Sequence, residues 1–351
     1  MTTATTLTSA KHQLLGLLHA LGDRERCQDL LAFAADVAEH ITNLYGHADE
    51  DDDDNRDDDD TDFVLPTLDD MENRAAAREE LAMIAADLRE SVPVVTAVLE
   101  SEAVTYPAER DGVRANMDQM SDLTSKNTVH VDAFLYDDAT VDDLCDEGQL
   151  ARYYCTACGT AKHVEPLNFI SHSLSVDNAE GLFSRYFKTT TLPILDIGSR
   201  TGALLYSAAH FTTSPTITGI ELNRDWAELS QTMVKRYALV DRISVLAGDV
   251  RTFRTAVEAA TGIIVMNNVF EYFADTQEQR AIWTWLLQHW SATWIVTVPA
   301  LESQWRACQL DTVEPQLVKA FQRRYVLART HTAVDGEFEV SMYRRRDAGQ
   351  Q

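Results

Sequence analysis

Short apolar runs alternate with helical patterns along the second half of the chain. The five runs, rich in Ile, Val, Leu and Thr, are residues 192–197, 216–221, 243–249, 262–267 and 293–298. Strands that alternate with helices form right-handed β-α-β units and a parallel sheet. Farther on, two alternating segments flank Asp335-Gly336, a dipeptide typical of β-hairpin turns. The pattern therefore predicts an α/β domain over residues 175–351 that ends in a hairpin.

A glycine-rich turn follows the first of these strands. It reads Asp196-Ile-Gly198-Ser-Arg200-Thr-Gly202 and leads directly into a helical segment. Backbone N–H groups at such a helix N-terminus can face a ligand. An acid beside the turn disfavours a phosphate and favours a cation or a ligand rich in hydroxyl groups.

Polar side chains also end the next three strands. They are Glu221, Asp249 and Asn267. The carboxyl ends of parallel strands meet at one edge of a sheet, where open α/β sheets bind ligands, so we expect these side chains to converge there with Asp196. Each acid by itself also has a structural explanation, because Asp249 could cap the following helix and Glu221 could be a surface charge.

Together these residues resemble the motifs of class I S-adenosylmethionine (SAM) methyltransferases. The resemblance covers about half of the chain and implies a Rossmann-like fold, with a seven-stranded, mostly parallel sheet completed by a C-terminal β-hairpin. It implies that the first motif wraps the methionine part of SAM, Glu221 holds the ribose hydroxyls, and Asp249 accepts from the adenine amino group. The implied cofactor contacts are Asp196, Gly198, Ser199, Gly202, Glu221, Leu222, Asp249, Val250 and Asn267.

Arg200 departs from the methyltransferase motif, which has a third glycine at this position. We expect the turn to accept this residue if its side chain projects outward. The same residue argues against a dinucleotide dehydrogenase, because the G-x-G-x-x-G fingerprint needs glycine where the backbone approaches pyrophosphate.

The end of the fourth strand reads Met-Asn267-Asn268-Val-Phe270-Glu271-Tyr272. The paired asparagines followed by Phe are similar to the fourth motif of the non-SET histone lysine methyltransferases. The resemblance implies an amine acceptor, either a protein lysine or a small amine, faced by Asn268, Glu271 and Tyr272. An alternative stays open, in which Asn267 caps a helix and the aromatic residues belong to the core.

A Cys-x-x-Cys-Gly sequence precedes the α/β domain, within a connector of residues 127–174. Two thiolates on a tight turn have the form of a zinc knuckle. The predicted structural zinc ligands are Cys145, Cys155, Cys158 and His172. A redox pair or two ordinary buried thiols are the alternatives.

Residues 1–126 show helical periodicity, including segments 71–88 and 92–104, and residues 49–62 form an acidic run that we expect to be a disordered loop. That run supplies −10 of the formal net charge of −26, and the basic clusters are small. This balance disfavours nucleic acid and would attract a basic protein or a small amine. The absence of a leader or a membrane-length apolar run indicates a soluble intracellular protein. The sequence thus favours a SAM-dependent methyltransferase, with a non-catalytic SAM-binding or zinc-containing interaction scaffold as the alternative, and leaves the oligomeric state open.

Overall fold

The fold is taken from a computed structural model that describes residues 68–92, 95–96, 98–102, 104, 106, 123–156, 163–332 and 339–346. The chain divides into two compact units, residues 1–73 and 74–351. The predicted acidic loop and the N-terminal helices before residue 68 lie outside the described residues, as do Cys158 and the Asp335-Gly336 turn.

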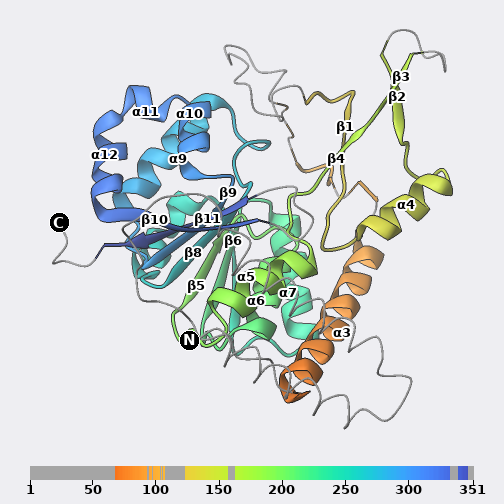
Figure 1. The fold of residues 1–351 in the computed structure, drawn as a ribbon, viewed down its shortest axis with the longest axis horizontal. Coiled ribbons are helices and arrows are strands. Elements are labelled where there is room, and N and C mark those ends of the chain that lie inside the picture. Colours follow the sequence, from red (N-terminus) through yellow and green to blue (C-terminus); the bar gives the residue numbers. More distant parts are fainter. Residues whose placement is uncertain are drawn as a thin grey trace, which may run out of the picture. The chain divides into compact units, whose positions relative to one another are not determined.

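A seven-stranded sheet forms the centre of the second unit (Figure 1). Its order is β10-β11-β9-β8-β5-β6-β7, with β5 to β9 parallel and the β10–β11 hairpin antiparallel to them. The strands are β5 Ile194–Ile197, β6 Ile217–Glu221, β7 Ile243–Ala247, β8 Ile263–Asn267, β9 Trp294–Val298, β10 Tyr325–Thr332 and β11 Glu339–Arg345. The predicted Rossmann-like fold, a seven-stranded and mostly parallel sheet that ends in a hairpin, is therefore confirmed.

Helices cover both faces of this sheet (Figure 1). One face carries α5 Val176–Tyr186, α6 Ala203–Phe211 and α7 Arg224–Arg236, and the other carries α8 Arg254–Ala259, α9 Thr276–His289, α10 Leu301–Ala307, α11 Leu310–Val313 and α12 Pro315–Arg324. Successive residues of β8 contribute to different cores, because Ile263 joins the α5–α7 side and Ile264 the opposite side. Both faces are buried, as a parallel sheet requires.

Polar residues fix where several helices begin. The side chain of Asn223 accepts from the backbone N–H groups of Asp225 and Trp226 at the start of α7. Asp275 accepts from Glu278 at the start of α9, 2.8 Å away. These side chains satisfy N–H groups that have no partner inside the helix.

One long helix before the α/β region confirms part of the helical prediction. It is α3, Leu68–Ser91. Arg78 of α3 pairs with Glu180 of α5, and Asp87 accepts from the hydroxyl of Tyr237, the residue that follows α7. The helix predicted over 92–104 is wrong for the described residues of that segment, which form turns or have no regular secondary structure. Pro93 explains the stop, because proline disfavours helical geometry in the residue before it and cannot donate a backbone hydrogen bond.

Residues 123–156 and 163–174 contain two small strand pairs and one short helix. β1 Thr128–His130 pairs in parallel with β4 Asn168–Ile170, and β2 Tyr153–Cys155 pairs antiparallel with β3 Val164–Pro166. The helix is α4, Asp138–Asp146. In the described part of the chain, no helix is both long and apolar enough to cross a membrane.

Candidate cofactor cavity

A cavity of about 450 Å³ lies at the carboxyl ends of β5 to β8. The sheet order reverses between β5 and β8, because the chain leaves β5 for β6 on one side and later returns to β8 on the other. In α/β sheets this switch point leaves a crevice for ligands. The predicted cofactor residues that line the cavity are Gly198, Glu221, Leu222, Asp249, Val250 and Asn267.

Backbone geometry explains the two glycines of the turn after β5. Gly198 and Gly202 have φ angles of +80° and +87°, which favour glycine. A Cβ at Gly198 would lie 2.6 Å from a methyl group of Val269, so this position also needs a residue without a side chain. Gly202 begins α6 and does not line the cavity, whereas Gly198 does.

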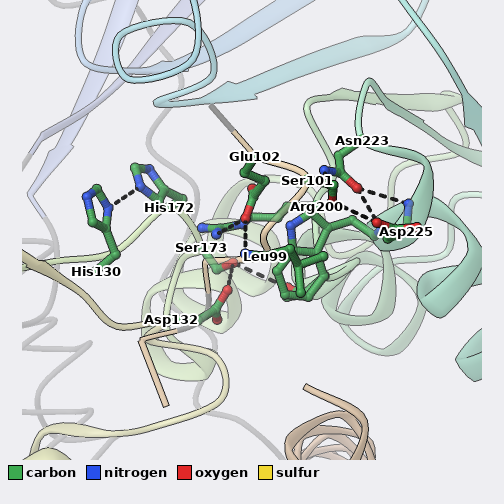
Figure 2. Close-up of polar contacts among 12 residues, drawn as sticks. Leu99, Ser101, Glu102, His130, Asp132, His172, Ser173, Arg200, Asn223 and Asp225 are labelled. Carbon is green, nitrogen blue, oxygen red and sulfur yellow. Dashed lines mark hydrogen bonds and ion pairs between the residues drawn. The ribbon is translucent and has the colours of Figure 1, made fainter. Parts of the chain in front are cut away.

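Arg200 enters the cavity wall, which corrects the expectation that its side chain projects outward. Only 5% of the residue is exposed, and its φ of +43° lies in the left-handed region. Its guanidinium lies 3.3 Å from the carboxylate of Glu102 (Figure 2) and over the rings of Trp226 and Phe273, at 5.1 and 5.8 Å. The acid and the two aromatic rings offset part of the cost of burying this cation.

Glu221 is buried at the end of β6 and held by backbone donors. Its two oxygens accept from the N–H groups of Arg200 at 2.8 Å and Asn223 at 2.7 Å. Burial raises the pKa of Glu221 above its usual range, and these two N–H groups oppose that change. A carboxylate has about four acceptor positions, so two remain for a ligand.

Asp196 is buried at the end of β5, and both of its oxygens are without a hydrogen-bond partner among the described residues. Burial, followed by the nearby charge of Glu221, raises the pKa of Asp196 to about 8. A buried carboxylate without a partner is costly, and a positive ligand charge or protonation relieves that cost. Asp196 does not line the cavity itself but precedes Gly198 by two residues. Ser199 is likewise buried outside the lining.

Asp249 lines the cavity and also caps the short helix η3, Val250–Phe253. Its carboxylate accepts from the backbone N–H of Arg251 at 2.8 Å and pairs with the guanidinium of the same residue. The hydrogen bonds from Arg251 lower the pKa of Asp249. The capping role considered from the sequence is thus present at a residue that also faces the cavity.

The residues after β8 divide into two groups. Asn268 and Phe270 line the cavity, but Glu271 and Tyr272 are not among its lining residues. Asn268 has a φ of +52°, and its side-chain oxygen is buried without a partner among the described residues. Tyr272 is fully buried. The structure therefore separates Tyr272 and Glu271 from the cavity wall that contains Asn268.

The described members of the predicted zinc ligand set do not come together. Three of its four members, Cys145, Cys155 and His172, lie in the described part of the chain, where no group of three or more His, Cys, Asp or Glu side chains could hold a metal ion. His172 instead lines the cavity, and its Nε2 lies 2.7 Å from Nδ1 of His130. The spacing of the Cys and His residues in the sequence suggested that His172 is a zinc ligand. That spacing could not show that the fold places His172 in the cavity wall at the end of the sheet.

Sequence reasoning missed several residues of the cavity wall. Glu102, Phe273 and Ser101 line it, and so does the inward-facing Arg200. The side chain of Ser101 donates to Asp225 at 2.7 Å, and that of Asn223 donates to Ser101 (Figure 2). Only Arg200 carried a signal in the sequence, as a large residue where the motif has glycine.

Comparisons with known proteins give the following. No protein-family model matches the sequence, and no curated protein matches it. Among solved structures, the chain is similar to an O-methyltransferase from Bacillus cereus in complex with SAH (TM-score 0.35, 15% identity, covering 50% of this chain and 84% of that one). It is also similar to the O-methyltransferase TomG from Streptomyces achromogenes in complex with SAM (0.35, 11%, 51% and 84%). A third similar structure is a methyltransferase from Geobacter sulfurreducens (0.34, 16%, 49% and 78%).

Proposed function

We propose that this protein is a SAM-dependent methyltransferase. The observation that carries the proposal is that one cavity, at the switch point of the sheet, contains Gly198, Glu221, Asp249 and Asn267 from the ends of four successive parallel strands. The order of the strands in the sheet, β7, β6, β5, β8, indicates how the parts of SAM would be arranged along the cavity. Adenine would lie near Asp249, the ribose at Glu221, and the methionine part near Gly198 and Asn267.

The buried charges fit such a cofactor. Glu221 keeps acceptor positions for two ribose hydroxyl groups. Asp196 has two buried oxygens without partners among the described residues, and the positive charge of SAM would favour its ionised form. The volume of about 450 Å³ lies in the range of ligand pockets. When bound, SAM would supply an activated methyl group.

The amine acceptor remains a prediction from the sequence. It rested on the Asn267–Asn268 pair, the aromatic residues Phe270 and Tyr272, and the acidic charge balance. Of these side chains, Asn267, Asn268 and Phe270 line the cavity and Tyr272 does not. The side-chain amide of Asn267 donates to the backbone carbonyl of His172 at 3.1 Å, so that amide has a structural role. We therefore propose methyl transfer here without assigning the acceptor to a lysine or a small amine.

Glu221→Gln is expected to weaken SAM binding by about tenfold or more. The amide keeps the size of the side chain but removes the charge and half of the acceptor capacity, and hydrogen bonds to charged groups contribute about 1.5–3 kcal/mol. Titration calorimetry with SAM and with its demethylated product measures the change. Glu228→Gln is the matched control, because Glu228 is an exposed residue of α7 that pairs with Arg224. Equal affinity in the Glu221 variant and the control would contradict the ribose assignment.

A further inference from the structure

We propose that His172 takes a proton from a hydroxyl group of the methyl acceptor, with His130 and Tyr106 passing that proton onward. This inference rests on the proposed methyltransferase function and names the acceptor chemistry of the same cavity. It makes His172 a catalytic residue, and His130 a residue that acts through it.

The strand pairing before the α/β region places the two histidines together. β1 and β4 are parallel, and His130 lies opposite Ile170, so His172 follows two residues after that position. Asp132 holds this arrangement, because it accepts from the hydroxyl of Ser173 at 2.6 Å (Figure 2). It also accepts from the N–H of Phe134 at 3.0 Å.

The two imidazoles and a tyrosine form a continuous hydrogen-bonded chain. Nε2 of His172 lies 2.7 Å from Nδ1 of His130 (Figure 2), and Nε2 of His130 lies 3.0 Å from the hydroxyl of Tyr106. A neutral imidazole has one donor and one acceptor nitrogen. If His172 donates to His130, and His130 donates to Tyr106, then Nδ1 of His172 keeps its lone pair.

This arrangement leaves Nδ1 of His172 as an acceptor for a ligand. Nδ1 of His172 is buried and has no hydrogen-bond partner among the described residues, and the residue is 6% exposed in the cavity wall. A buried polar atom without a hydrogen bond costs free energy, and a ligand hydroxyl group that donates to Nδ1 would remove that cost.

His172 lies at the end of the cavity where the methyl group is expected. Its backbone carbonyl accepts from Asn267 at the end of β8, whereas Asp249, assigned to adenine, follows β7. β5 and β6 separate these two strands in the sheet. An acceptor beside His172 would therefore face the methionine side of the cofactor and not its base.

The surroundings keep both histidines uncharged at neutral pH. Burial lowers the pKa of His172 well below its usual range, and the charges of Arg200 and His130 add to this. Burial and Arg200 lower the pKa of His130 to about 4. The ring of Tyr272 contacts both histidines edge-on, with its centroid 5.2 Å from that of His172 and 5.8 Å from that of His130. His172 is thus already deprotonated when an acceptor arrives.

The proposed step balances with these groups alone. With SAM bound, the acceptor oxygen would use a lone pair to form its bond to the methyl carbon, and the electron pair of the sulfur–methyl bond would stay on sulfur. The hydroxyl proton moves to Nδ1 of His172 as the oxygen loses electron density. The Nε2 proton of His172 then passes to His130, and the Nε2 proton of His130 to the oxygen of Tyr106, which releases its own proton to solvent because Tyr106 is partly exposed.

Nitrogen NMR of the protein with labelled histidines tests the pair without any acceptor. We expect His172 in the SAH complex to be neutral from pH 6 to 8, with the proton on Nε2 and none on Nδ1. The signal is assigned by its loss in His172→Gln. Finding the proton on Nδ1 of His172, or an imidazolium at pH 7, overturns the proposal.

Methyl transfer from tritiated SAM to protein and protein-free fractions of a cell extract tests the reaction. We expect label in products that release methyl iodide with hydriodic acid, as O-methyl groups do, at a rate that is flat above pH 6.5. His172→Gln should lower that rate by about 100-fold or more, the usual contribution of a general base, with SAM affinity changed by less than threefold. His289→Gln, far along the chain on α9, is the matched control.

The outcomes separate the two proposals. Label on nitrogen, a rate that rises through pH 8 to 10, or an unchanged rate in His172→Gln overturns the role of His172 while the methyltransferase stands. Failure of the wild-type protein to bind SAM overturns the proposed function itself. Binding without any transfer contradicts both, and agrees with a non-catalytic scaffold.

Discussion

Asp196→Asn is expected to raise the free energy of unfolding between pH 6.5 and 8 and to flatten its pH dependence there. The pKa of this buried carboxyl is about 8 in the folded chain, against about 3.9 in an unfolded one. The folded protein therefore holds a proton that the unfolded protein releases. Between these values its stability falls as the pH rises, by up to about 1.4 kcal/mol per pH unit. Asparagine does not ionise and removes this slope.

Denaturant unfolding at pH 6.5, 7.25 and 8 measures the effect. The window begins at 6.5 because His130 and His172, whose pKa values are lowered, give a slope of opposite sign below that pH. Asp138→Asn is the control, since Asp138 is exposed in the first turn of α4. Parallel curves for the wild type and Asp196→Asn would contradict the raised pKa.

The same carboxyl links stability to the proposed cofactor. A positively charged ligand favours the ionised form of Asp196, so SAM binding below pH 8 should release a proton. Calorimetry in two buffers of different ionisation enthalpy detects that proton, and Asp196→Asn should abolish its release and weaken SAM binding. The neutral side chain of Asp196→Asn would thus raise the stability of the protein and lower its affinity for SAM.

Trp283→Ala is expected to lower the free energy of unfolding by about 3–5 kcal/mol, the usual cost of removing a fully buried large aromatic side chain. Trp283 lies in α9 and meets the rings of Trp290 and Trp305 edge-on, with centroids 6.2 Å away in each case. It also meets Phe270, at 5.2 Å, which lines the cavity. The cavity left by alanine would therefore reach the wall behind the proposed cofactor.

Urea unfolding and SAM binding together measure this variant. Trp285→Ala is the matched control, because Trp285 is on the same helix but only partly buried, stacked on His289. We expect the control to cost much less. A loss below 1 kcal/mol for Trp283→Ala would show that α9 is not packed as described.

The alternation of strands and helices was enough to predict the α/β sheet and its hairpin. The spacing of apolar residues along a segment decides which of its side chains face a core. Each buried strand of a parallel sheet also needs a helix to cover it. The residues after each strand were also found, since parallel strands bring their carboxyl ends to one edge whatever the loops do. Gly198, Glu221, Asp249 and Asn267 line one cavity for that reason.

The positions of side chains from outside the sheet could not be predicted in this way. The side chain of Arg200 was expected to point outward. It points into the cavity wall because its guanidinium contacts Glu102, about a hundred residues earlier in the chain, and the ring of Trp226. The spacing around Cys155 suggested a metal site, but the parallel pairing of β1 with β4 puts His172 against His130.

The sequence by itself thus determined the sheet and the strand ends that surround the cavity. The sheet follows from the local spacing of apolar residues, and the strand ends meet because β-α-β connections bring the carboxyl ends of parallel strands to one edge. Only the tertiary structure decided what completes the cavity wall. Contacts between segments far apart in the chain depend on packing and on the pairing of buried charges and hydrogen bonds, and no short stretch of sequence records those.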